Sequence, residues 1–118
     1  MFLPAPDESI WLGVLRISFL VPASRSLKDK RRVVAQVRDR IRARHQLMAA
    51  EVGHLDDHQW AVMSVASTSN DARTLRAALE AIARDIEAWG EARVQTVDVE
   101  VLRPFSTGGP HVGPLRGE

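Results

Sequence analysis

Segments of strand periodicity alternate with two stretches of helical periodicity along this 118-residue chain, and their order restricts the possible folds most. Four segments show the alternation or apolar clustering of β-strands: 10–21, 47–53, 59–68 and 92–103. The first predicted helix opens with a capping pattern at Ser26 and Asp29. The second begins after Ser69 or Asn70 and ends at Gly90. The predicted order is therefore β-α-β-β-α-β.

This order leads to one compact arrangement. Two right-handed β-α-β crossovers in a chain of this size give a four-stranded antiparallel sheet with both helices on one face. We therefore predict an α+β, ferredoxin-like sandwich at 10–103. A loose leader is expected at 1–9. A tail at 104–118, rich in glycine and proline, is expected to be disordered.

The uncovered face of the predicted sheet is one candidate interaction surface. The first and last strands should be neighbours there, so that Arg16 can pair with Asp98 or Glu100. The third strand is expected to be apolar on both faces. Because an apolar sheet face usually meets another surface, one hypothesis is a homodimer formed around Val14 and Val62. In that hypothesis the basic first helix docks an acidic protein partner.

The distribution of charge supplies the other candidate surface. Residues 25–44 contain nine of the sixteen Lys and Arg residues and two acids, a net charge of +7, while the other residues carry −6. Arg32 and Arg40 lie where Asp39 and Asp29 are expected to neutralise them in part. Four cations share a stripe about 21 Å long beside the apolar face of the helix, namely Lys28, Arg31, Arg38 and Arg42. Such a row fits a phosphate backbone, which predicts binding to RNA with little base specificity.

The entrance of the first helix is a second candidate anion site. Free N–H groups and the helix dipole attract anions at a helix N-terminus. Arg25 lies there, and Lys30 could extend back toward it, so that the two side chains would hold a phosphate group. The alternative is simple capping of the helix by Ser26.

Base stacking on the sheet, as in RNA-recognition motifs, is not expected. The chain has no tyrosine, and the aromatic residues of the predicted strands are limited to Trp11, Phe19 and Trp60.

Motifs that would indicate an enzyme are absent from the sequence. There is no P-loop, dinucleotide fingerprint, zincin motif, nucleophile elbow or cysteine, so we predict no enzymatic activity and no cofactor. Arg25 and Asn70 resemble the catalytic pair of an acylphosphatase, but the glycine-rich phosphate cradle is missing. The turn at 54–58 holds two histidines and two aspartates, yet a turn gives them no shared face, so a solvated turn is expected rather than a metal site. His45 and His111 are more isolated still.

No contact with a membrane is expected. The longest apolar stretch, at 10–21, is too short and too polar to span a bilayer. Acidic residues precede it, where a signal peptide would have basic ones. The sequence therefore predicts a cytoplasmic protein.

Several strings of residues resemble one known family. GVLRISFLVPASRSLKDKRRVV, with AEVG near residue 50, SND at 69–71 and VDVEVL at 97–102, is similar to the YlxP-like family of small bacterial proteins. The similarity covers about 13–102, and the block at 25–32 is its most specific part. This resemblance implies a ferredoxin-like fold. Genes of the family often lie beside those for transcription elongation, translation initiation and ribosome maturation, which favours a role with RNA or the ribosome. The family supplies no established catalytic residues.

Overall fold

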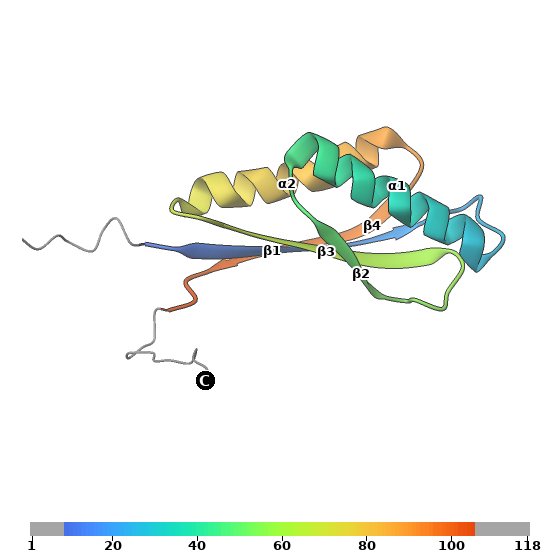
Figure 1. Cartoon of the computed structure of the whole chain (residues 1–118), viewed down its shortest axis with the longest axis horizontal. Coiled ribbons are helices and arrows are strands. Elements are labelled where there is room, and N and C mark those ends of the chain that lie inside the picture. The colour runs from blue at the N-terminus through green and yellow to red at the C-terminus, as the bar shows by residue number, and fades with distance from the viewer. Residues whose placement is uncertain (1–8, 106–118) are drawn as a thin grey trace, which may run out of the picture.

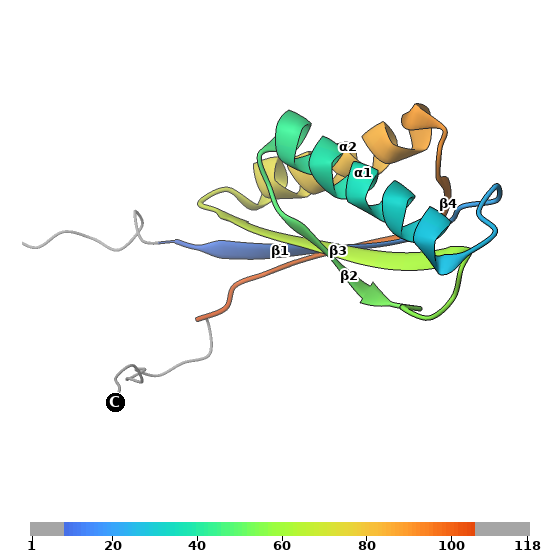
Figure 2. The ribbon, with the colours of Figure 1, turned by 45° about the vertical axis from the view of Figure 1, so that its right-hand side comes forward.

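The fold has the predicted order of elements. The computed structural model describes residues 9–105, so nearly all of the expected leader and tail lies outside the described residues. Its elements are β1 (Trp11–Leu20), α1 (Leu27–His45), β2 (Ala49–Gly53), β3 (Trp60–Ser69), α2 (Ala72–Trp89) and β4 (Arg93–Leu102). The strands form one antiparallel sheet in the order β2-β3-β1-β4, with both helices on one face (Figure 1, Figure 2). The predicted ferredoxin-like sandwich is confirmed.

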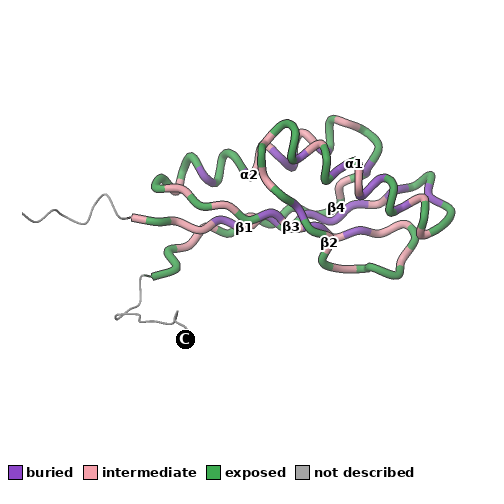
Figure 3. The backbone as a smooth tube through the Cα atoms, in the orientation of Figure 1, coloured by how far each residue is buried: buried purple, intermediate pink, exposed green. Residues whose placement is uncertain are grey.

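The hydrophobic core fills the space between the helices and the sheet. Alternate residues of β1 and β3 point toward the helices, and Figure 3 shows buried positions recurring along these strands. On the apolar face of α1, Leu27 is half-buried, and the other apolar residues are buried, namely Val33, Val34, Val37 and Ile41. The core consists mainly of Leu15, Ile17, Phe19, Val34, Val37, Ile41, Met63, Val65, Leu79, Ile82 and Ile86. Helical and strand periodicities in the sequence thus correspond to one shared apolar layer.

A glycine in β1 allows α2 to approach the sheet closely. A β-carbon added at Gly13 would lie 2.7 Å from Leu79 Cδ1 and 2.9 Å from Leu75 Cγ. Both distances are shorter than a normal contact, so a larger residue fits only if the Leu75 and Leu79 side chains or α2 itself shift.

The helix ends agree with the predicted caps, with one correction. Ser26 caps α1, and its hydroxyl accepts a hydrogen bond from the N–H of Asp29 at 3.0 Å. Gly90 ends α2 in the left-handed conformation. The N-cap of α2 is Asp71 rather than Ser69 or Asn70, because the Asp71 carboxylate accepts the N–H of Thr74.

The open face of the sheet is more polar at its centre than the sequence suggested. Met63 and Val65 point into the core, so the outward side of β3 alternates apolar residues with Ser64. The predicted cross-strand pair forms between Arg16 and Asp98, with the guanidinium 3.1 Å from the carboxylate. The expectation that β3 is apolar on both faces therefore holds only in part.

The two edges of the sheet differ in length. β2 has five residues and a shift of register after Glu51, whereas β4 has ten residues and pairs only with β1. Neither α1 nor α2, the helices of the described chain, is long and apolar enough to cross a bilayer.

Candidate nucleic-acid interface

The first turn of α1 fixes the direction in which the basic helix leaves the sheet. The Ser26 hydroxyl accepts from Asp29, and the Asp29 carboxylate accepts the N–H of Arg25 at 3.0 Å. These two bonds resemble a capping box in which the returning bond reaches one residue farther back than usual. The Asp29 carboxylate therefore occupies the entrance of the helix, where an external anion would otherwise bind.

One flank of α1 exposes a row of cations. Lys28, Arg31, Arg38 and Arg42 are all exposed, as predicted from their spacing along the helix. Within residues 9–105, Lys28, Arg31 and Arg38 form no side-chain hydrogen bond or ion pair. Arg42 lies 3.7 Å from Asp39, and both side chains are more than two-thirds exposed, so this pair contributes little. We call these four residues the α1 stripe.

The α1 stripe lies on the side of the helix that faces the β2 edge. Arg38 and Arg42 line a small groove of about 50 Å³ together with Asp39, Met48 and Ala49. Met48 is 79% exposed. Cationic and apolar surface therefore meet at this edge.

The cations on the opposite flank of α1 share a single acid of α2. The Asp85 carboxylate is 2.9 Å from the Arg40 guanidinium, 3.3 Å from Arg44 Nε and 3.0 Å from His45 Nε2. The Arg40 guanidinium also lies 5.5 Å from the ring centroid of Trp89. The partner expected for Arg40 was Asp29, so the structure corrects that prediction. It also corrects the view of His45 as isolated.

Ion pairing keeps Asp85 ionised. Burial alone would raise the pKa of Asp85, but hydrogen bonds from His45 and Arg40 and the charges of Arg40 and Arg44 outweigh it. The pKa of Asp85 therefore lies below its ordinary value. Because this carboxylate is engaged with the α2 side of α1, it does not compensate the charge of the α1 stripe.

Arg32 is also paired, though with a different acid from the one expected. Its guanidinium lies 3.8 Å from Asp29, one turn back along α1, rather than near Asp39. A small cavity of about 100 Å³ beside them is lined by Ser24, Asp29, Arg32 and Glu91, among others. Two carboxylates in this lining make it unsuitable for a phosphate group.

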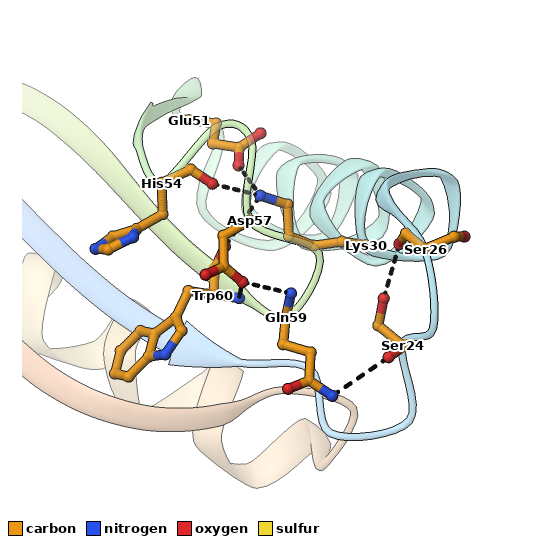
Figure 4. Close-up of polar contacts among 8 residues, drawn as sticks. All are labelled: Ser24, Ser26, Lys30, Glu51, His54, Asp57, Gln59 and Trp60. Carbon is orange, nitrogen blue, oxygen red and sulfur yellow. Dashed lines mark hydrogen bonds and ion pairs between the residues drawn. The ribbon is translucent and has the colours of Figure 1, made fainter.

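Lys30 does not reach the helix entrance, and this prediction is wrong. Its side chain is 1% exposed and its Nζ donates hydrogen bonds to the carbonyl oxygens of His54 and Trp60, at 2.8 and 2.9 Å (Figure 4). Glu51 Oε2 lies 2.9 Å from the same nitrogen, close enough for an ion pair although outside hydrogen-bond geometry. Lys30 thus fastens α1 to the β2–β3 turn. It is not available to hold a phosphate with Arg25, whose exposed side chain remains alone at the entrance.

The turn between β2 and β3 is built around Asp57. Its carboxylate accepts the N–H groups of Gln59 and Trp60 at 2.8 and 2.9 Å, and these bonds lower the pKa of Asp57 (Figure 4). The His54 ring lies 5.7 Å from that of Trp60. In the part of the chain that the structure describes, no three His, Asp or Glu side chains gather as metal ligands.

Two acids with structural roles, Glu51 and Asp85, were missed by sequence reasoning. Glu51 is on the inward face of β2, since it pairs with Met63, and an acid in that position signals a buried cation. Asp85 lies beside the apolar stripe of α2, next to Ile86. Neither position in the sequence identifies the basic residue that the acid contacts.

A second concave surface lies on the open face of the sheet. It has a volume of about 500 Å³ and is lined by Val14, Arg16, Ser64, Asp98 and Glu100, among others. Apolar and charged groups alternate here. Such a mixture could meet another protein surface.

Comparison with known proteins identifies the family of the chain. A search of curated proteins finds no match. The model of a family described as a protein of unknown function, DUF503, matches residues 12–99, which extend from the second residue of β1 well into β4. The chain therefore belongs to the DUF503 family.

Proposed function

We propose that the protein is a YlxP-like, non-enzymatic factor of the bacterial cytoplasm that binds RNA or the ribosome through the α1 stripe. The observation that carries this proposal is the asymmetry of α1. Asp85 pairs with Arg40 and Arg44 on the flank toward α2, while Lys28, Arg31 and Arg38 of the α1 stripe have no acidic partner within residues 9–105. Cations in a row on a rigid helix match the spacing of a phosphate backbone and gain free energy by releasing counterions.

The stripe supports contact with phosphates rather than reading of bases. Its side chains project along one flank of the helix, and the groove of about 50 Å³ beside Arg38 and Arg42 is too small for a base. We therefore expect affinity with little dependence on sequence and a strong dependence on salt. Arg25 extends the cationic surface at the helix entrance.

Binding to a structured RNA across a salt titration tests the proposal. Four phosphate contacts predict a log–log slope of about −3 to −4. Arg31→Glu/Arg38→Glu removes two of them, and we expect binding to fall and the slope to lose about half its magnitude. Arg84→Glu/Arg93→Glu is the matched control, because it makes the same change of charge at exposed positions outside the stripe.

The control decides how the result is interpreted. Equal losses in both double variants would mean that net charge, not the stripe, governs association, and the proposal would fail. Co-sedimentation of the same three proteins with ribosomes at matched salt extends the comparison to the assembled particle.

A homodimer through the open face is the second candidate function. The concave surface around Arg16 and the partly exposed Val14 and Val62 favour it. In this case the basic helix would dock an acidic protein. Analytical ultracentrifugation of the wild type and Val62→Glu tests it, and a wild type that remains monomeric at high concentration would refute it.

A further inference from the structure

A second cationic surface lies at the end of the sheet where β1 begins, α2 begins and β4 ends (Figure 1). A shallow groove of about 380 Å³ is lined there by Trp11, Ala72, Arg73, Arg76 and Val101. The guanidinium of Arg103 lies 5.3 Å from the ring centroid of Trp11. Three arginines that are distant from Trp11 in sequence thus surround one aromatic side chain.

The lining of this groove carries positive charge. Among the described residues 9–105, none of its lining residues is a carboxylate, and the first turn of α2 contains no acidic residue. Asp71, just outside the groove, caps α2 through Thr74, and the Thr74 hydrogen bonds together with the charge of Arg73 lower its pKa. Arg73 and Arg76 lie one turn apart on α2 and repel one another, and a bound anion would relieve the repulsion.

The polar groups of the groove are arranged as donors. Arg76 reaches across to the carbonyl oxygen of Val99, at 3.5 Å, which holds its guanidinium between α2 and β4. Within residues 9–105, Arg73 makes no side-chain hydrogen bond or ion pair, and neither does the indole N–H of Trp11. Guanidinium groups bind phosphate oxygens in pairs of parallel hydrogen bonds.

We propose that this groove, lined by Trp11, Arg73 and Arg76, binds a phosphate group. Resting on the proposed function, we assign that phosphate to the backbone of the nucleic acid held by the α1 stripe. Arg73 and Arg76 contact the phosphate oxygens, and the partly exposed Trp11 ring forms an apolar wall beside them. The α1 stripe faces the β2 edge and the groove lies between α2 and β4, so the nucleic acid must pass around the end of the sheet where α2 begins to reach both surfaces.

Inorganic pyrophosphate tests the site without any nucleic acid. The chain has three tryptophans, so ¹⁵N-labelled protein gives three indole N–H signals, and those of Trp60 and Trp89 serve as internal references. We expect a saturable shift of the Trp11 signal alone. Arg73→Glu should abolish the shift, whereas Arg84→Glu, which makes the same change elsewhere on α2, should preserve it. No shift, or the same shift in both variants, would overturn the site.

The RNA titration then separates this inference from the proposed function. A contact at Arg73 predicts that Arg73→Glu reduces the salt slope by about 1, with Arg84→Glu unchanged. If the stripe variant loses binding while Arg73→Glu matches Arg84→Glu, the groove does not contact RNA and the assignment to the backbone fails alone. If the wild type binds no RNA but pyrophosphate shifts Trp11, the proposed function fails and the phosphate site stands.

Discussion

Replacing Lys30 by methionine should cost a large part of the stability of this domain. The Lys30 ammonium group is buried, donates to two carbonyl oxygens and lies 2.9 Å from the Glu51 carboxylate, which is itself only 15% exposed. Methionine keeps a side chain of similar length but leaves all three oxygens without their cation. Hydrogen bonds from a charged donor contribute about 1.5–3 kcal/mol each, and removing one partner of a buried ion pair costs about 3–5 kcal/mol.

We therefore expect Lys30→Met to lower the free energy of unfolding by about 3–5 kcal/mol. Urea denaturation followed by tryptophan fluorescence measures this quantity by linear extrapolation. Lys28→Met is the matched control. It changes an exposed lysine two positions away and should stay within about 0.5 kcal/mol of the wild type.

A double variant separates the contribution of the carboxylate from that of the carbonyls. Lys30→Met/Glu51→Met removes the unpaired acid as well, so it should lose less stability than Lys30→Met alone, while the two carbonyl oxygens stay unsatisfied. The reasoning is refuted if Lys30→Met is as stable as Lys28→Met. It is also refuted if the double variant is the less stable of the two.

Three further predictions concern the rest of the fold. The pKa of Asp85 is lowered in the folded protein, so its ion pairs stabilise the fold fully above the ordinary aspartate pKa of 3.8. This stabilisation is lost as the pH falls through the lower pKa of the folded state. The difference in stability between the wild type and Asp85→Asn should therefore shrink in urea titrations from pH 5 to about pH 2. Gly13→Ala should cost about 1–3 kcal/mol in the same assay, since its methyl group would overlap Leu79 and Leu75, and an unchanged midpoint would show that α2 shifts freely. Gly90→Ala should lower the stability by about 1 kcal/mol, because Gly90 has a left-handed backbone (φ +88°), although no atom lies within 4 Å of the added β-carbon. Gly90→Asn should lower the melting temperature less than Gly90→Ala in thermal melts.

The fold could be predicted because local patterns determine it. The apolar positions of α1 and α2 repeat with the helical period, and those of β1 and β4 with the period of a strand, so the face that each element buries is fixed before any partner is known. The exposure of Lys28, Arg31, Arg38 and Arg42 follows from the same geometry, since it depends only on their angle from the apolar face of α1.

The partners of the charged residues could not be predicted in this way. Lys30 binds oxygens 24 and 30 residues away, and Asp85 binds groups 40 and 45 residues away. Such contacts depend on how two elements pack together. The sequence predicted that Lys30 extends to the helix entrance. Its burial depends on the position of the β2–β3 turn, which the helical angle does not give.

The charges along β4 bear on how copies of this chain can associate. β4 is a ten-residue edge strand, and a long edge of this kind is a template for pairing with another chain. If two copies joined antiparallel along β4 with the two-fold axis at Asp98, Val99 or Glu100, acidic side chains would lie directly opposite one another across the junction. Like charges in that position destabilise the pairing. The acids that line the open face thus also protect the edge from continuous sheet growth, and they steer self-association toward surfaces other than β4.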